Sequence, residues 1–373
     1  MRIAVNTRLL LPGRLEGIGW FAHETLSRIV TAHPEHQFIF LFDRPWNAQF
    51  IYAPNVVPVA AGPPTRHPIL YRIWFDAVVP GLLRKHKADL FLSPDGYLSL
   101  RTSVPQVPVM HDLNFEHHPD DLPPAYRRFY RKFFPRFARK AARIVTVSGF
   151  SKQDIMDRYG VPAEKIDVVH NGVGTVFGPA TDEEKVAARR KLTNGHPYVI
   201  CVGSLHPRKN IARLLQAFDR VAAGQPDLRL VIVGEDFWWD QRMKEAWKGL
   251  AHADRVVFTG RLGQHDLRKA LGGAMALAYV SYFEGFGIPV AEAMRCGVPV
   301  LAAKATSLPE VAGEAALYCD PFDVDDIANG LRTLANDPGL RDRLAREGLV
   351  RSERYTWDAT ARGLWESIAK VLA

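Results

Sequence analysis

Short runs of apolar residues alternate with longer stretches of helical periodicity along the whole chain of 373 residues. Most of the runs are continuous and rich in Val, Ile and Phe, which is typical of parallel strands buried on both faces. Because helical patterns separate the runs, the sequence predicts the α/β class, with doubly wound parallel sheets made of βαβ units. We expect strands at 3–5, 38–42, 56–59, 90–92, 107–110, 144–147 and 166–169, and then at 199–202, 230–233, 256–258, 276–280, 298–302 and 316–318.

The length of the chain and a turn-rich stretch near its middle divide it into two domains. A chain of 373 residues is too long for one compact core. Residues 171–179 are rich in Asn, Gly and Pro, the usual turn formers, and we place the hinge there. We therefore expect an N-terminal Rossmann-like domain at 1–178 and a C-terminal one at 179–353. Apolar residues recur at helical spacing in the tail, so residues 354–373 are expected to form a helix that packs back on the first domain.

Composition and charge restrict the class of protein further. Hydrophobic residues make up 47% of the chain and charged residues 24%, as in ordinary globular proteins. No run of 18 apolar residues is present, and the start of the chain turns polar too soon for a signal peptide, so we expect a cytoplasmic protein without a transmembrane helix. The cysteines, Cys201, Cys296 and Cys319, are too widely spaced for a metal pair and are expected in the core.

The positive charge is concentrated in the first half. The net charge is +8, and residues 1–178 carry +7 of it, with 22 Lys and Arg against 15 Asp and Glu. We therefore expect the first domain to meet an anionic partner or surface.

Residues 284–292 read Glu-Gly-Phe-Gly-Ile-Pro-Val-Ala-Glu and form the most informative stretch of the chain. The glycines allow a ligand to approach the backbone, and Pro289 is expected at the first helical position. A helix N-terminus offers free N–H groups to an anion. Carboxylates beside an anion indicate that the same ligand also carries hydroxyl groups, as a nucleotide-sugar does. The alternative is a buried strand–turn–helix with two solvated glutamates.

A second candidate anion site follows the strand predicted at 199–202. Residues 203–210 read Gly-Ser-Leu-His-Pro-Arg-Lys-Asn and precede a helical pattern at 211–223. Arg208, Lys209 and the helix N-terminus are therefore expected to bind an anion, although a solvated Arg-Lys pair on a turn is an alternative. The segment has neither the P-loop pattern nor the Rossmann fingerprint, which argues against ATP hydrolysis and NAD binding.

Together these two motifs resemble those of glycosyltransferase family 4, whose members are retaining, two-domain transferases with the GT-B fold. Residues 110–112 (Met-His-Asp), 147–151 (Val-Ser-Gly-Phe-Ser), 169–173 (Val-His-Asn-Gly-Val) and 307–311 (Ser-Leu-Pro-Glu-Val) also resemble family segments. The resemblance covers nearly the whole chain, and the ordered combination of motifs is specific. It implies a GT-B architecture, in which two Rossmann-like domains face each other across a cleft and the C-terminal helix crosses back to the first domain.

The resemblance also implies roles for single residues. Arg208 and Lys209 are expected to hold the donor diphosphate, and Glu292 to accept hydrogen bonds from the ribose hydroxyls. Glu284 and the backbone after it are expected to contact the donor sugar, and His111 to approach the sugar from the first domain. Some members have an arginine where this chain has Ser204, so the phosphate charge would rest on Arg208 and Lys209. The resemblance places Gly17 and Gly19 in a glycine-rich loop after the first strand and makes Gly234, Glu235, Arg261 and Leu262 the candidates for contact with the base. The catalytic set is thus Glu284, His111, Arg208 and Lys209, and the donor-binding set adds Gly17, Gly19, Gly203, Ser204, Gly234, Glu235, Arg261, Leu262, Gly285, Phe286, Gly287, Ile288 and Glu292.

Three other kinds of chemistry receive less support. Asp323-Val324-Asp325 has the spacing of a metal-ligand pair, but it precedes a helical pattern, where acidic residues are common, so we expect no metal. Glu284 and Glu292 do not resemble the facing carboxylates of a glycoside hydrolase. Some nucleotide-sugar epimerases and glycogen-type phosphorylases share the two-sheet architecture, but the phosphorylases need pyridoxal phosphate and a longer chain, so the epimerase is the enzyme alternative.

Residues 127–143 contain eight Lys or Arg and five aromatic residues among 17 positions. Phe129, Phe133 and Phe137 share one helical face, so the stretch is either an amphipathic helix at an anionic membrane or a core-facing aromatic stripe with a solvated basic face. A non-enzymatic nucleic-acid-binding or membrane-surface-binding protein would use the same stretch, but no nucleic-acid-binding module is present, and we expect no nucleic-acid partner.

The resemblance therefore implies a retaining glycosyltransferase that moves a hexose from a nucleotide-sugar to a hydroxyl of a glycan or lipid-linked acceptor, in surface-polysaccharide assembly. GDP-mannose is the first expectation for the donor, although the residues do not separate it from a UDP-sugar. No cofactor is expected. The setting would be the cytoplasm, with peripheral contact at the inner face of the membrane as a hypothesis.

Overall fold

Two parallel sheets carry the fold, each in its own unit of the chain. The computed structural model describes residues 1–235 and 239–373. Unit 1 comprises Met1–Gly172 and Thr356–Ala373, and unit 2 comprises Val173–Tyr355. The chain thus leaves unit 1 within the turn-rich stretch 171–179 and returns to it just before the last helix.

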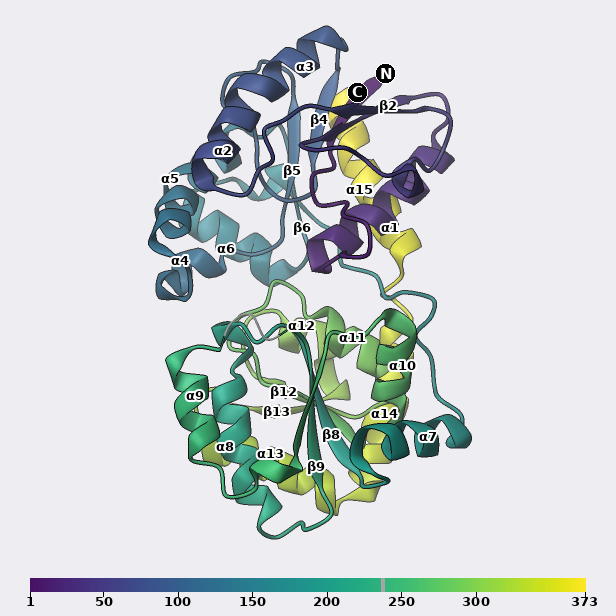
Figure 1. The fold of residues 1–373 in the computed structure, drawn as a ribbon. Helices are drawn as coiled ribbons and strands as arrows, with labels where there is room; N and C mark the ends of the chain where they lie inside the picture. Colours follow the sequence, from purple (N-terminus) through teal and green to yellow (C-terminus); the bar gives the residue numbers. More distant parts are fainter. Residues whose placement is uncertain (236–238) are drawn as a thin grey trace. The chain divides into compact units, whose positions relative to one another are not determined.

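The sheet of unit 1 has seven parallel strands in the order β3-β2-β1-β4-β5-β6-β7 (Figure 1). The strands are β1 (Arg2–Asn6), β2 (Gln37–Phe42), β3 (Val56–Ala60), β4 (Leu90–Ser93), β5 (Gln106–Met110), β6 (Ile144–Thr146) and β7 (Ile166–Val168). The helices are α1 (Gly17–Ala32), α2 (Pro68–Ile73), α3 (Val79–Lys85), α4 (Asn114–His117), α5 (Pro124–Lys140), α6 (Gly149–Tyr159) and α15 (Trp357–Leu372). Because β1, β2, β4 and β5 are almost fully buried, the uninterrupted apolar runs in the sequence are explained by helices on both faces.

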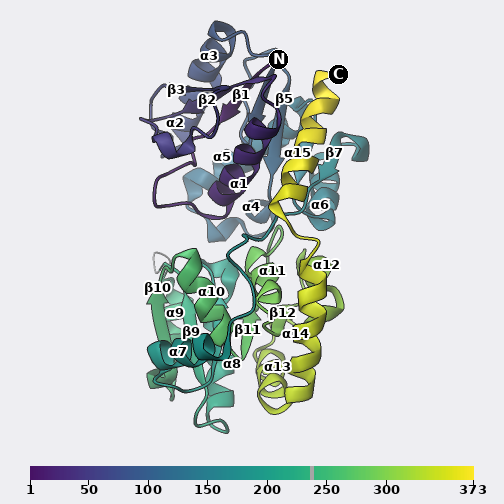
Figure 2. The same cartoon turned by 90° about the vertical axis from the view of Figure 1, so that its right-hand side faces the viewer.

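The C-terminal helix α15 lies beside α1 on one face of this sheet (Figures 1 and 2). The ring of Trp365 stacks on His33 with a centroid distance of 3.6 Å. Arg28 Nε and Asp358 Oδ1 form an ion pair at 2.6 Å, and Thr360 Oγ1 donates a hydrogen bond to the carbonyl of His170. The predicted return of the C-terminal helix to the first domain is therefore confirmed.

The sheet of unit 2 has six parallel strands in the order β10-β9-β8-β11-β12-β13 among the described residues. The strands are β8 (Tyr198–Val202), β9 (Arg229–Val233), β10 (Val256–Gly260), β11 (Ala276–Tyr279), β12 (Val300–Ala303) and β13 (Leu317–Cys319). The helices are α7 (Asp182–Thr193), α8 (Ile211–Ala222), α9 (Gln241–Lys248), α10 (Gln264–Gly273), α11 (Ile288–Arg295), α12 (Leu308–Ala312), α13 (Val324–Asn336) and α14 (Pro338–Ser352). Helices α8, α9 and α13 share one core with the sheet, while α7 packs against α10. These two sheets confirm the predicted α/β class.

In both sheets the strand order reverses between two neighbours, which are β1 and β4 in unit 1 and β8 and β11 in unit 2. Ligands of open α/β sheets bind at the carboxyl ends of the strands, beside such a switch point. In unit 2 the loops there are those that follow β8 and β11, and they contain the two sequence motifs at 203–210 and 284–292. The topology therefore brings together two segments that are about 80 positions apart in the chain.

No helix among the described residues has the length and apolar character needed to cross a bilayer.

Candidate functional site

The loop after β8 depends on close contact with the loop after β9. Gly203 has φ of +148°, and a Cβ there would lie 3.1 Å from Cε of Lys209. A Cβ at Gly234 would lie 1.9 Å from the carbonyl oxygen of Gly203, a backbone atom that cannot move aside easily. Glycine at both positions therefore lets the two loops meet and lets the Lys209 side chain pass over the first of them.

Arg208 and Lys209 come from a 3-10 turn, η5 (Pro207–Lys209), and both reach Glu284. Lys209 Nζ donates to Glu284 Oε1 at 2.6 Å, and Arg208 Nη1 lies 2.6 Å from Glu284 Oε2. The same Oε1 accepts hydrogen bonds from Tyr279 Oη at 3.0 Å and from Ser281 Oγ at 2.7 Å. We call these five residues the charged cluster.

The backbone of Glu284 is fixed from the other side by the loop that precedes α12. Its N–H donates to Thr306 Oγ1 at 3.1 Å, and Ser307 Oγ donates to its carbonyl oxygen at 2.9 Å. Both the backbone and the carboxylate of Glu284 are therefore held in place, so the residue can act as a rigid partner for the two cations.

Electrostatics keep the cluster charged although it is buried. Burial alone would raise the pKa of Glu284, but Arg208 and Lys209 outweigh it and lower that pKa to about 2. Burial lowers the pKa of Lys209, and the ion pair with Glu284 opposes this change. Burial and the nearby carboxylate hold the pKa of Tyr279 well above its usual value, so its hydroxyl stays protonated. With two cations and one carboxylate, the cluster has a net charge of one positive.

Helix α11 begins directly after the cluster. Gly287 is its N-cap with φ of +96°, and a Cβ there would lie 2.6 Å from Cδ2 of Leu308, so glycine is required. Ile288 is the first helical residue, so the helix begins one residue earlier than predicted and Pro289 occupies its second position. Phe286 is buried, and its ring makes an edge-to-face contact with Tyr355 at 5.3 Å. The first turn of α11 therefore presents N–H groups next to a positively charged cluster.

Glu292 is half-buried in α11, and no hydrogen bond or ion pair to its side chain is found within 1–235 and 239–373. Burial raises its pKa to about 8. A carboxyl group of this kind is costly to ionise until hydroxyl or N–H donors reach it, and ribose hydroxyls are donors of that type.

The raised pKa of Glu292 predicts a pH-dependent stability. The folded protein keeps a proton on this group up to about pH 8, whereas the unfolded chain releases it near 4.5. The stability of the wild type should therefore fall as the pH rises from 4.5 to 8. Glu292→Gln removes this loss, and after a discount for solvent screening we expect it to stabilise the ligand-free protein by about 2 kcal/mol at pH 8.5 and by almost nothing at pH 5. Urea unfolding at the two pH values measures this difference.

The exposed Glu353→Gln is the matched control in the same unit, and it should leave the pH profile of the wild type unchanged. A Glu292→Gln profile parallel to that of the wild type would show that Glu292 is ionised in the folded protein.

The residues predicted to contact the base lie at the same edge of the sheet of unit 2. The N–H of Leu205 donates to the carbonyl of Glu235 at 3.2 Å, and Glu235 Oε1 lies 3.7 Å from Nη1 of Arg261. Leu262 is half-buried beside Arg261, and Ser204 is exposed. The loops after β8, β9 and β10 are thus adjacent, while the role of these residues in base recognition stays a prediction.

The predicted residues of unit 1 lie at the carboxyl edge of its own sheet. His111 follows β5, and its Nε2 lies 2.8 Å from the carbonyl oxygen of Pro94. Because a carbonyl can only accept, Nε2 carries the proton, and burial lowers the pKa of His111, so the ring is neutral. Gly17 and Gly19 lie in the first turn of α1, not in a loop before it. A Cβ at Gly19 would lie 3.0 Å from the carbonyl of Leu9, which indicates a role in local packing.

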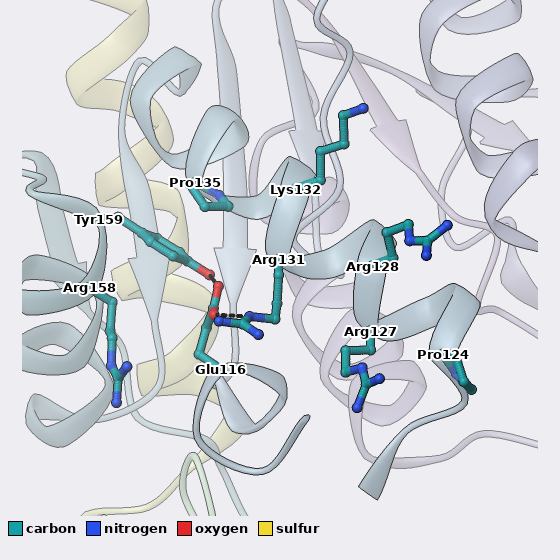
Figure 3. A pocket seen from close by; sticks show the side chains of 9 residues that line it. All are labelled: Glu116, Pro124, Arg127, Arg128, Arg131, Lys132, Pro135, Arg158 and Tyr159. Atoms are coloured by element: carbon teal, nitrogen blue, oxygen red, sulfur yellow. Dashed lines mark hydrogen bonds and ion pairs between the residues drawn. The ribbon is translucent and has the colours of Figure 1, made fainter. Parts of the chain in front are cut away.

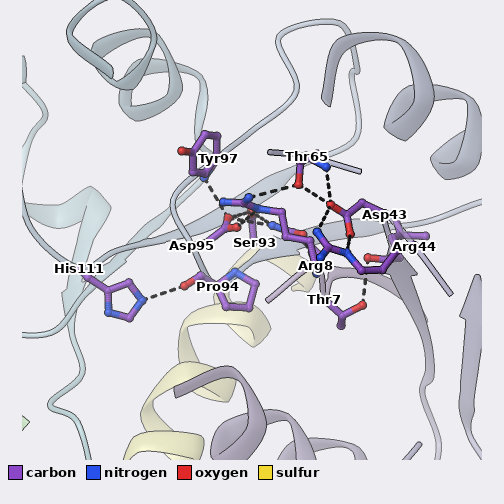
Figure 4. A network of polar contacts seen from close by, with 12 residues as sticks. Thr7, Arg8, Asp43, Arg44, Thr65, Ser93, Pro94, Asp95, Tyr97 and His111 are labelled. Carbon is purple, nitrogen blue, oxygen red and sulfur yellow. Dashed lines mark hydrogen bonds and ion pairs between the residues drawn. The ribbon is translucent and has the colours of Figure 1, made fainter. Parts of the chain in front are cut away.

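Sequence reasoning missed a buried polar network at the switch point of unit 1 (Figure 4). Arg8, after β1, has Nε 2.5 Å from Oδ2 of Asp95, after β4. The guanidinium of Arg8 also lies 4.6 Å from the ring centre of Tyr97, and Asn6 Nδ2 donates to Asp95 Oδ1 at 2.8 Å. The available signal was the polar run Asn-Thr-Arg directly after the first apolar strand.

In unit 2, the partners Tyr279, Ser281 and Thr306 of Glu284 were also missed. Thr306 is distant from Glu284 in sequence, and the carboxylate of Glu284 was assigned to a ligand.

The acidic pair at 323–325 forms a helix cap. Asp323 is the N-cap of α13 and accepts hydrogen bonds from the N–H groups of Asp325 and Asp326. Within the described parts of the chain no three His, Cys, Asp or Glu residues lie close enough to hold a metal ion. Cys201, Cys296 and Cys319 are buried free thiols, as predicted.

Comparisons with known proteins match both halves of the chain. The model of Glycosyltransferase Family 4 matches residues 17–177, and that of Glycosyl transferases group 1 matches residues 182–350. The chain is 29% identical over 365 residues to the O-antigen chain mannosyltransferase B of Escherichia coli, covering 92% of this chain and 93% of that relative. It is 34% identical over 195 residues to a GDP-mannose-dependent monoacylated alpha-(1-6)-phosphatidylinositol monomannoside mannosyltransferase of Corynebacterium glutamicum, covering 49% and 50% of the two chains. The solved sucrose-phosphate synthase of Thermosynechococcus elongatus has the same fold, with a TM-score of 0.79 and 18% identity over 100% of this chain and 99% of that one.

Proposed function

Since the chain belongs to glycosyltransferase family 4, with the group 1 glycosyltransferase domain in its second half, we propose that it transfers a hexose from a nucleotide-diphosphate sugar to a hydroxyl group of an acceptor. The acceptor would be a glycan or a lipid-linked glycan, and the product a surface polysaccharide. The proposal gains support from the similarity over most of the chain to an O-antigen chain mannosyltransferase.

The charged cluster of unit 2 carries this proposal. It has a net positive charge, it lies at the switch point between β8 and β11, and the first turn of α11 begins beside it. A diphosphate needs such a combination of cations and free N–H groups. We assign the diphosphate to Arg208, Lys209 and the N–H groups of α11, and the ribose hydroxyls to Glu292.

Glu284 would have two tasks in this assignment. Its carboxylate holds Arg208 and Lys209 in one place, which spares the cost of ordering them when the donor binds. The resemblance also implies that Glu284 contacts the donor sugar. Oε1 accepts from Lys209, Tyr279 and Ser281, whereas Oε2 pairs with Arg208. The Oε2 side of the carboxylate is therefore the less crowded one for a contact with the donor sugar.

In the proposed reaction the bond between the anomeric carbon and the β-phosphate oxygen breaks, and negative charge develops on the leaving diphosphate. Arg208 and Lys209 would stabilise that charge, and each contact of this kind contributes about 10²–10³ in rate. We propose that the anomeric configuration is retained and that the leaving phosphate accepts the proton of the acceptor hydroxyl. Neither a metal nor a cofactor is part of this proposal, and a contact of His111 with the sugar stays a prediction.

The first proposal for the donor is GDP-mannose, because the similar proteins of E. coli and C. glutamicum are mannosyltransferases and the second is GDP-mannose-dependent.

We also propose a cytoplasmic enzyme with peripheral contact at the inner face of the membrane. The apolar face of α5 is buried in unit 1, where Phe129, Phe133 and Phe137 are at most 5% exposed. Any membrane contact by α5 must therefore use its basic face.

A thermal-shift screen of GDP, UDP, ADP and their sugars tests the proposal. We expect one nucleoside diphosphate to stabilise the full chain, by about 3 kcal/mol at 100 times its dissociation constant. The matching monophosphate is the control, and it should stabilise less because it lacks the phosphate assigned to Arg208 and Lys209. Failure of all three diphosphates to stabilise the protein would refute the proposal. Conversion of the stabilising sugar nucleotide without an acceptor would favour the epimerase instead.

A further inference from the structure

A basic pocket of about 610 Å³ lies on unit 1, and its lining includes none of the residues assigned to the donor (Figure 3). Three elements form it, namely the outer face of α5, the end of α6 and the short helix α4. Its lining residues are Glu116, Pro124, Arg127, Arg128, Arg131, Lys132, Pro135, Arg158 and Tyr159. The volume lies within the range of small-molecule binding pockets.

The fold explains why α5 presents cations but does not explain why they surround a hollow. Phe129, Phe133 and Phe137 fill the core, so the opposite face of α5 must be exposed, and a solvated basic face would satisfy this requirement. The pocket has a second wall, however, because Arg158 and Tyr159 at the end of α6 lie opposite α5, with Glu116 between them (Figure 3). The pocket is therefore lined by cations from two helices.

The charges of the pocket are far from balanced. Five cationic side chains and one carboxylate line it, which leaves an excess of four positive charges. The single carboxylate, Glu116, accepts from Arg131 Nε at 3.2 Å and from Tyr159 Oη at 3.1 Å. Just outside the lining, Arg127 pairs with Asp120, while Arg158 Nε lies 3.8 Å from Asp154 Oδ1 and Arg158 Nη2 donates to Nδ1 of His117. These two further carboxylates reduce the excess to two positive charges. Such a surplus costs electrostatic free energy in the absence of an anion, and a phosphate group would offset it with charge-assisted hydrogen bonds.

The position of the pocket indicates which phosphate it would take. Glu116 belongs to α4, which follows β5 and the His111 loop directly, so the pocket borders the carboxyl edge of the sheet of unit 1. The donor diphosphate has its own cations in unit 2. We propose that the basic pocket binds a phosphate or diphosphate group of the acceptor molecule. This inference rests on the proposed function, because only a transferase has an acceptor.

Two pairs of adjacent Arg and Lys residues on α5 provide a matched test. Arg131 and Lys132 line the pocket, whereas Arg139 and Lys140 lie in the last turn of the same helix outside it, and all four side chains are exposed. The double variants R131A/K132A and R139A/K140A thus remove the same charges from the same helix. Thermal unfolding should show that both remain folded.

The probe is inorganic pyrophosphate, titrated by calorimetry into the full chain with an excess of GDP or UDP, whichever stabilises the protein more. We expect R131A/K132A to weaken pyrophosphate binding at least about tenfold and R139A/K140A to change it less than twofold. Binding of the nucleotide itself should be the same in both variants and in the wild type. If the wild type does not bind a nucleotide, the proposed function is refuted. The pocket is then still tested by the same pyrophosphate titration without nucleotide.

A vesicle assay separates this inference from general attraction to a membrane. Both double variants are sedimented with vesicles of phosphatidylglycerol and of phosphatidylcholine. Equal losses of binding to the anionic vesicles in both variants, with unchanged pyrophosphate binding, would show a diffuse membrane-facing surface and overturn the pocket. Loss of pyrophosphate binding in R131A/K132A alone supports a discrete phosphate site, whatever the vesicles show.

Discussion

Glu284→Gln is expected to lower transfer activity by at least about 10² and the free energy of unfolding by about 3–5 kcal/mol. The carboxylate is the shared partner of Arg208 and Lys209, so its removal raises the net charge of a buried cluster from one positive to two positive. The amide N–H group would also point toward Arg208 or Lys209, which can only donate. The loop after β11 should therefore be less stable, and the two cations should no longer be held in position for the diphosphate.

The pH dependence of stability gives this prediction a second readout. The pKa of Glu284 is about 2 in the folded protein and close to 4.5 when the chain unfolds. The stabilisation by this carboxylate is therefore complete above pH 4.5 and is lost as the pH falls from 4.5 toward 2. Glu284→Gln should lose less stability than the wild type over that interval, because it has no carboxylate to protonate.

Urea unfolding and initial rates of transfer measure these effects. Asp325→Asn is the matched control, since Asp325 forms an exposed ion pair with Arg220 in the same unit, and it should cost less than about 1 kcal/mol. Wild-type stability in Glu284→Gln would contradict the view that Glu284 holds the two cations together.

The fold was largely predictable because parallel βαβ proteins carry a strong periodic signal. Each predicted strand overlaps an observed one, and α15 lies within the range 354–373 where the C-terminal helix was expected. Buried strands in such sheets are continuous apolar runs, and little else in a sequence resembles them. The helix start at 284–292 was one residue off, because Gly287 in a left-handed conformation, not Pro289, sets the first turn of α11.

The partners within the site were less predictable. Motifs indicated that Arg208, Lys209 and Glu284 serve one ligand, but only the order of β8 and β11 in the sheet shows that these side chains bind one another. The Arg8–Asp95 pair across the switch point of unit 1 escaped detection for the same reason, because strand order cannot be read from local periodicity. The basic stretch 127–143 shows a further limit. Its charge was evident, but the pocket with Arg158 depends on the packing of α5 against α6.

Lys209→Met is expected to lower kcat by about 10²–10³ while changing the free energy of unfolding by less than about 2 kcal/mol. Methionine keeps the long apolar stem that passes over Gly203, and it removes only the ammonium group. Burial already lowers the pKa of Lys209, which means that the folded protein pays to keep this charge. Without it, Arg208 and Glu284 remain as a balanced pair, and Tyr279 and Ser281 still donate to the carboxylate.

Lys209→Met and Glu284→Gln therefore test the charged cluster in opposite directions, one toward neutrality and the other toward excess charge. If the cluster served only the fold, both variants would lose stability and activity would follow stability in each. If it serves a leaving diphosphate, Lys209→Met should have a lower kcat at near-normal stability. Its affinity for the nucleoside diphosphate should also fall by more than its affinity for the matching monophosphate, which is the control. Arg220→Ala, which removes an exposed cation from the end of α8, should change neither quantity appreciably. A normal kcat in Lys209→Met would show that the buried ammonium takes no part in the chemistry. Stabilisation of the diphosphate would then have to depend on Arg208.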